Sequence, residues 1–176
     1  MSAKRICKDA ILTAIALVAF MVENLFPPLL FFAPGAKLGL SNAVALITLI
    51  IVGAPDAFVV IILKCTLGAV FAGNPFSLVY SLPSALASIG VQTALYLTLF
   101  PRISLMAISL TGATAFNIVQ LSIASLVAGV NMLPLLPLML AASLVAGAAV
   151  GLIAFLTVRF LPRSVCVNDF RERRIK

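Results

Sequence analysis

The sequence predicts an all-α integral membrane protein: six transmembrane helices in one bundle, with both termini in the cytoplasm. Hydrophobic residues make up 63% of the 176 residues and charged residues only 10%, whereas a soluble domain has roughly 45–50% apolar and about 25% charged residues. The apolar segments are continuous instead of alternating, which favours spanning helices over membrane strands. At about 20 residues for each span, the chain has room for six helices and no separate soluble domain.

The expected helices make the whole chain, 1–176, a single transmembrane domain. We expect them at approximately 9–25, 38–53, 55–71, 76–100, 103–130 and 137–160. Most of the twelve basic residues lie in the first eight or the last eighteen positions, and Arg102 falls in the turn before the fifth helix. Basic segments stay on the cytoplasmic side, so this pattern explains the net charge of +7 without nucleic-acid binding. It predicts a multi-pass protein of the cell (plasma) membrane.

The first expected helix follows a short basic leader, 1–8. Glu23 and Asn24 come after its apolar run and no small-residue cleavage site is evident, which indicates a retained helix instead of a signal peptide. Ala10 and Ala14 are four residues apart and therefore share one helix face. Small residues on that face let another helix approach closely, either within the bundle or in a partner subunit.

A proline-rich segment, 25–37, separates the first two helices. Pro27 and Pro28 cannot continue an ordinary helix, so we expect this segment to lie along the outer interface or dip into it. The second helix is then short for a hydrocarbon layer of about 30 Å. A short helix leaves backbone groups unpaired, which are tolerated only beside protein or a polar cavity. Pro55 and Asp56 favour the start of the third helix, because proline suits the first turn and a carboxylate suits the positive end of the helix dipole.

The last three helices are apolar, with few polar positions. Pro83 is expected to interrupt the fourth helix. Asn117 and Gln120 are three apart in the fifth helix and share a face. Gly129 and the prolines that follow it predict an outer loop before a sixth helix rich in Ala and Gly.

Two lysines, Lys37 and Lys64, lie at positions where membrane proteins rarely carry a charge. Lys64 lies eight residues after Asp56, which is roughly 12 Å into the membrane, and a charge at that depth costs about 2.5–3.5 kcal/mol. Its ammonium therefore pairs with Glu23, contacts carbonyl groups or meets an anionic ligand. Lys37 precedes the short second helix, whose free N–H groups favour an anion; the alternative is a lysine that extends to the outer headgroups.

The remaining candidates are amide and aromatic side chains near the same helices. Asn42 is expected in the second turn of helix two, and Asn117 in helix five. Either binds a ligand or bonds a neighbouring helix. Asn74 closes the turn after helix three, where an Asn before a proline is also ordinary turn chemistry. Tyr80, one turn further along, either stacks on a ligand ring or belongs to an interfacial aromatic belt.

The chain lacks the residues of known catalytic designs. It has no histidine, and its five carboxylates form no aspartate-rich cluster for diphosphate chemistry. It has no phosphate-binding loop lysine motif either. Cys7 and Cys166 fall in the basic tails and Cys65 in a span, with no metal or disulfide spacing. We therefore expect no enzyme activity, no cofactor and no metal site, and active transport would need a partner or an ion gradient.

Three segments, GAKLGLSN, GNPFSLVYSL and FNIVQL, resemble those of the Gx transporter family, often labelled heptaprenyl diphosphate synthase component I. The resemblance runs from about Ala10 to Phe160. This family is in turn similar to the S components of energy-coupling factor transporters, which are six-helix substrate-binding proteins with a small-residue motif on helix one. The resemblance implies that Ala10, Ala14 and Ala16 contact a transmembrane coupling subunit. It also implies that Leu25–Lys37 covers the ligand.

Two functions follow as hypotheses. In the first, the protein binds a small nutrient, vitamin or isoprenoid/quinone-related precursor in its outer half, and a separate ATPase module drives uptake. The site would then be lined by Lys37, Asn42, Lys64, Asn74, Tyr80 and Asn117. In the second, it is a non-catalytic membrane subunit that partners an enzyme of isoprenoid (heptaprenyl diphosphate), quinone or flavin metabolism. An ion-driven carrier is disfavoured, because Glu23 alone offers little for a proton relay.

Overall fold

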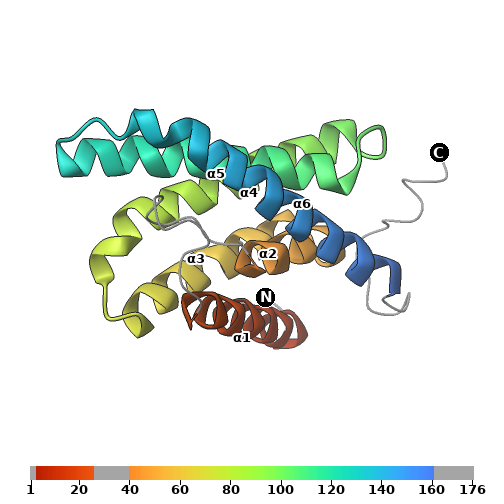
Figure 1. The fold of residues 1–176 in the computed structure, drawn as a ribbon. Helices are drawn as coiled ribbons and strands as arrows, with labels where there is room; N and C mark the ends of the chain where they lie inside the picture. The colour runs from red at the N-terminus through yellow and green to blue at the C-terminus, as the bar shows by residue number, and fades with distance from the viewer. Residues whose placement is uncertain (1–2, 26–39, 161–176) are drawn as a thin grey trace.

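The computed structural model describes residues 3–25 and 40–160, and in these residues it is all-helical. The elements, in chain order, are α1 Ala3–Leu25, α2 Leu40–Ile51, α3 Ala54–Phe71, the 3-10 turn η1 Pro75–Ser77, α4 Leu78–Leu99, α5 Leu105–Ala128, the 3-10 turn η2 Leu133–Leu135 and α6 Leu136–Phe160 (Figure 1). Four helical segments are long and apolar enough to cross a membrane, namely α3, η1 with α4, α5, and η2 with α6. The all-α prediction is confirmed.

Helix α1 begins earlier than the sequence indicated, at Ala3 instead of near residue 9. The expected basic leader is therefore part of the helix in the residues that the structure describes. Arg5, in the first turns, donates two hydrogen bonds of 2.6 Å each to the two carboxylate oxygens of Asp56 at the start of α3. Because Asp56 is only 1% exposed, this ion pair gives the extra helical turns a fixed partner.

Helix α4 is continuous through Pro83, which was expected to interrupt it. A proline removes one backbone hydrogen bond, but a helix in apolar surroundings tolerates this where neighbouring groups satisfy the freed backbone. The carbonyl that loses its donor is that of Val79, and the helix continues on both sides of this single missing bond. Helix α5, by contrast, ends where expected, with Gly129 in the left-handed conformation at a φ of 65°, which favours glycine.

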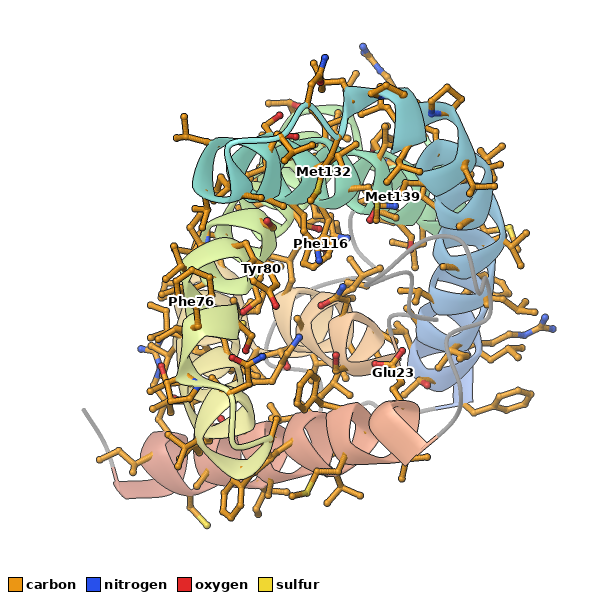
Figure 2. All side chains as sticks on the ribbon, turned by 60° about the vertical axis from the view of Figure 1, so that its left-hand side comes forward. Glu23, Phe76, Tyr80, Phe116, Met132 and Met139 are labelled. Atoms are coloured by element: carbon orange, nitrogen blue, oxygen red, sulfur yellow. The ribbon has the colours of Figure 1, made fainter. Side chains whose placement is uncertain are left out.

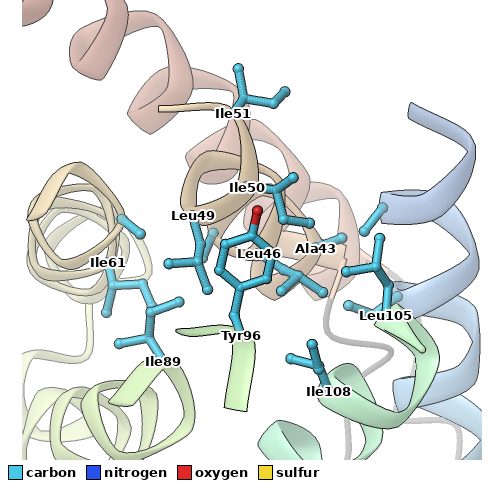
Figure 3. Close-up of a cluster of buried hydrophobic side chains, with 14 of the residues drawn as sticks. Ala43, Leu46, Leu49, Ile50, Ile51, Ile61, Ile89, Tyr96, Leu105 and Ile108 are labelled. Carbon is cyan, nitrogen blue, oxygen red and sulfur yellow. The ribbon is translucent and has the colours of Figure 1, made fainter. Parts of the chain in front are cut away.

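The helices form a ring around the short helix α2. Along the ring α1 packs against α3, α3 against α4, α4 against α5, and α5 against α6. Helix α2 contacts α1, α3, α4 and α6 and lies inside the ring in Figure 2. Its side chains Leu46, Leu49 and Ile50 are at the centre of the largest buried cluster, next to Ile108 and Tyr96 (Figure 3). An enclosed helix meets no lipid, so its 12 residues suffice.

Basic residues gather at one end of the bundle. The start of α1, the start of α3, the α4–α5 link and the end of α6 share this end, and they carry Arg5, Lys8, Arg102 and Arg159. At the opposite end, the described residues 21–25, 40–42, 71–78 and 128–137 contain no Lys or Arg. The bundle is therefore electrostatically asymmetric along its axis.

Helices α5 and α6 approach closely because glycines face their contact. A Cβ added at Gly151 would lie 2.8 Å from the Cα of Met106, and one at Gly147 would lie 3.0 Å from the Cα of Leu110. Both contacts are with backbone, so a side chain could be accepted only if a helix moved. Gly90 in α4, by contrast, has open space around its added Cβ.

We predict that Gly151→Ala lowers the unfolding temperature in detergent, because overpacking costs about 1–3 kcal/mol. The matched control is Gly90→Ala, which replaces a helical glycine without a clash. This control should leave stability unchanged or raise it, by about 0.5–1 kcal/mol. A thermal unfolding measurement in which both variants behave alike would contradict the close α5–α6 contact.

Candidate ligand-binding cavity

A cavity of about 190 Å³ lies inside the ring, and all six helices contribute to its lining. On α1, α2 and α3 its lining comes from the final turns of α1, the first turn of α2 and the second half of α3, towards the end of the bundle without basic residues. On α4, α5 and α6 the lining runs through the middle of the bundle, as far as Gln92, Ser109 and Val150. Figure 2 shows Glu23, Tyr80 and Phe116 around the centre of the ring. The polar lining residues are Glu23, Ser41, Asn42, Lys64, Ser77, Tyr80, Ser81, Ser88, Gln92, Ser109, Asn117, Gln120 and Ser143.

The charged wall of the cavity comes from α1, α2 and α3. Lys64 is only 5% exposed, and its Nζ donates a hydrogen bond of 3.0 Å to Oδ1 of Asn42. Glu23 is 7% exposed and lies close enough for its charge to act on that of Lys64. Ser41 donates its hydroxyl to Oε2 of Glu23 at 3.4 Å. The buried ammonium thus has an amide acceptor and a carboxylate that offset its charge in an apolar bundle.

The uncharged wall comes from α4, α5 and α6. Two of its polar atoms, Oγ of Ser109 and Oε1 of Gln120, are buried and have no hydrogen-bond partner in the described part of the chain. Gln92 of α4 packs against α5 at Gly112, where an added Cβ would lie 2.2 Å from the Gln92 amide nitrogen. Because Gly112 has no side chain, the Gln92 amide can lie in this space beside the cavity.

Asn117 both lines the cavity and joins two helices. Its Nδ2 donates a hydrogen bond of 2.9 Å to the backbone carbonyl of Met139 in α6. This satisfies part of the amide and fixes its direction. The two interpretations that the sequence left open for Asn117, a ligand contact and a helix–helix bond, are compatible in this arrangement.

The model of one protein family, heptaprenyl diphosphate synthase component I, matches residues 12–157. The chain belongs to this family. The resemblance to heptaprenyl diphosphate synthase component I is thereby confirmed. No curated protein matches the chain at a significant level.

Within this family member, four of the six residues expected in the ligand site line one cavity: Asn42, Lys64, Tyr80 and Asn117. Asn74 does not line it. Its side chain is exposed in the turn before η1, where its backbone carbonyl accepts a hydrogen bond from the Ser77 hydroxyl. Lys37, Cys166 and the covering segment from residue 26 onwards lie outside the described residues.

The structure also brings residues into the site that the sequence analysis left out. Ser81, Ser88 and Gln92 line the cavity from α4, and Ser109 lines it from α5. Serine is too common in membrane helices to stand out singly. Their spacing could have indicated a polar helix face, because Ser81, Ser88 and Gln92 are seven and four residues apart and therefore lie on one side of α4. Glu23 was considered as a partner of Lys64, and it is also part of the lining.

The three alanines expected to contact a partner do not share one surface. Ala10 and Ala14 are exposed on α1. Ala16 is completely buried, in a cluster with Val44 and Val60. The structure therefore corrects the expectation for Ala16, which packs inside the bundle. The physical reason is its position on the helix: at about 100° for each residue, Ala16 points well away from the face of Ala10 and Ala14.

We predict that Asn42→Ala lowers the unfolding temperature in detergent, because Lys64 loses its acceptor inside the bundle. Leaving a buried donor unsatisfied costs about 1–3 kcal/mol, and more for a charged group. Asn74→Ala is the matched control: its side chain is exposed, and the substitution should change stability little. Equal unfolding temperatures for Asn42→Ala and the wild type would mean that the Lys64–Asn42 hydrogen bond is absent in the membrane protein.

Proposed function

We propose that the protein is a solute-binding membrane subunit similar to the S components of energy-coupling factor transporters. It takes up a small nutrient, vitamin or isoprenoid/quinone-related precursor. The observation that carries this proposal is the polar cavity in the middle of an apolar bundle, with Lys64, Asn42 and Glu23 on one wall. Ionisable groups at such depth face the bundle interior or a cavity and mark a ligand pathway.

The orientation of the bundle supports capture from outside the cell. Basic residues concentrate at cytoplasmic ends, and Arg5, Lys8, Arg102 and Arg159 share one end. That end, with both termini, is then cytoplasmic in a plasma membrane protein of six spans in a single domain. The charged wall of the cavity, from α1, α2 and α3, lies towards the other end, which supports entry of the solute from the outer side.

Energy for transport would come from a partner. The chain has no phosphate-binding loop lysine motif, so a separate ATPase module and its transmembrane coupling subunit would act on this protein. Helix α1 packs against α2 and α3 only on its inner side. Its outer side exposes Ala10 and Ala14 beside Ile11 and Val18. Small residues among apolar ones allow a partner helix to approach closely.

The family description favours a second candidate, a non-catalytic membrane subunit of an enzyme of isoprenoid, quinone or flavin metabolism. The description names a component of heptaprenyl diphosphate synthase. The chain has no aspartate-rich motif for diphosphate chemistry, so in this function it would recruit or position a catalytic partner. The two candidates differ in what should co-purify with the protein.

We predict that the wild-type protein, purified from its own membranes in mild detergent, carries a small molecule that Lys64→Met loses. Native mass spectrometry measures the bound mass, and thermal unfolding reports whether each variant is folded. Lys8→Met is the matched control, because Lys8 is exposed at the far end of the bundle and its removal should leave binding unchanged. A wild-type protein without any bound molecule would contradict the solute-binding function, and a folded Lys64→Met variant that keeps the molecule would contradict the site.

A second prediction concerns the partner. Ala14→Leu should abolish co-purification of a coupling subunit with its ATPases, because the larger side chain blocks the close approach of another helix. Ligand binding should remain. The matched control, Ala141→Leu, changes an exposed alanine on α6 and should keep the complex. Recovery of a prenyltransferase or redox enzyme in place of the ATPases would support the second candidate function.

A further inference from the structure

We propose that the cavity accepts a small molecule without net charge, either neutral or zwitterionic, that carries hydroxyl, amide or ring-nitrogen groups. It does not accept a diphosphate. This inference rests on the proposed solute-binding function and narrows its substrate class. Two independent observations carry it, the charge balance of one wall and the unsatisfied polar atoms of the other.

The charged wall already contains its own counter-charge. Among the lining residues that the structure describes, Lys64 is the basic residue and Glu23 the acidic one, so their formal charges cancel. Both side chains are more than nine-tenths buried, where an additional unpaired charge is costly. A diphosphate would bring a negative charge that these groups do not balance. A molecule without net charge would not disturb the balance between these two side chains.

The uncharged wall has hydrogen-bonding capacity that the protein does not use. Ser109 is 1% exposed, yet its hydroxyl oxygen has no partner among the described residues, and the same is true of Oε1 of Gln120. Both residues line the cavity from α5. Nearly all buried polar groups in native proteins have a partner, so these two indicate a ligand that supplies one. A ligand that pairs with these atoms supplies a hydrogen-bond donor to Oε1 of Gln120, and a donor or an acceptor to the Ser109 hydroxyl.

Small residues on α5 and α6 lie beside the polar groups of this wall. Gly112 allows the Gln92 amide to lie against α5. On α6, the lining residues Ala142, Ala146 and Gly147 are small. The uncharged wall therefore combines amides and hydroxyls with small residues, which leave space for a polar molecule.

The test uses a defined probe, the small molecules released by heat from the wild-type protein purified from its own membranes. Anion exchange at neutral pH divides this extract into a flow-through without net negative charge and a retained anionic fraction. We expect the flow-through to raise the unfolding temperature of ligand-stripped protein. The anionic fraction, inorganic diphosphate and isopentenyl diphosphate should leave it unchanged at millimolar concentration.

Stabilisation by the anionic fraction or by isopentenyl diphosphate would overturn the substrate class while leaving solute binding in place. An extract with no molecule that binds, in either fraction, would overturn both this inference and the solute-binding function. The two failures are therefore distinguishable.

Variants of the uncharged wall separate a ligand contact from a structural role. Ser109→Ala and Gln120→Met should each weaken binding of the flow-through fraction about tenfold, the effect of one lost hydrogen bond. Neither should lower the unfolding temperature of the ligand-free protein, because an unsatisfied buried atom is removed. Ser122→Ala, on the exposed side of α5, is the control and should change neither quantity. If these variants bound the fraction as the wild type does but unfolded at a lower temperature without ligand, Ser109 and Gln120 would have a structural role. That result would contradict the proposal.

Discussion

The burial of one ammonium group, that of Lys64, is the constraint on which the arrangement of the first three helices depends. A charge in the centre of a membrane helix costs about 2.5–3.5 kcal/mol unless other groups accept it. Asn42 accepts a hydrogen bond from Lys64 at 3.0 Å, and Glu23 supplies the opposite charge. The end of α1 and the start of α2 must therefore meet the middle of α3. At the other end of the bundle, the Arg5–Asp56 ion pair again joins α1 to α3, so charges hold α1 at both ends.

The fold could be predicted from sequence to a large extent because apolar runs and prolines mark the helices directly. The expected ranges agree with the observed helices to within a few residues for α2 to α6. The start of α1 was not predicted, because a segment with Lys4, Arg5 and Lys8 is typical of a solvated leader. The sequence alone does not show that Asp56 lies opposite Arg5 and binds it. The effect of Pro83 was overestimated, since a local rule about proline takes no account of the groups that surround α4 in the bundle.

The site could be predicted only in part, and the reason is the cost of burying each residue type. A lysine or an asparagine in an apolar run is conspicuous because its burial is expensive, and Lys64, Asn42 and Asn117 all line the cavity. A serine can donate its hydroxyl to its own helix, as Ser143 does to Leu140, so its presence in a span indicates little. Asn74 does not line the cavity, because a turn residue close to the cavity in sequence is exposed at the end of the bundle.

The distribution of unsatisfied groups bears on the choice between a binding protein and a pure scaffold. A helix bundle that only positions an enzyme gains nothing from polar atoms without partners, and each such atom costs about 1–3 kcal/mol. Ser109 and Gln120 nevertheless carry such atoms on the same cavity, which Lys64 and Glu23 also line. Apolar side chains of similar size at these positions would pack the same helices at lower cost. The polar lining is therefore one ground for proposing that the cavity binds a ligand.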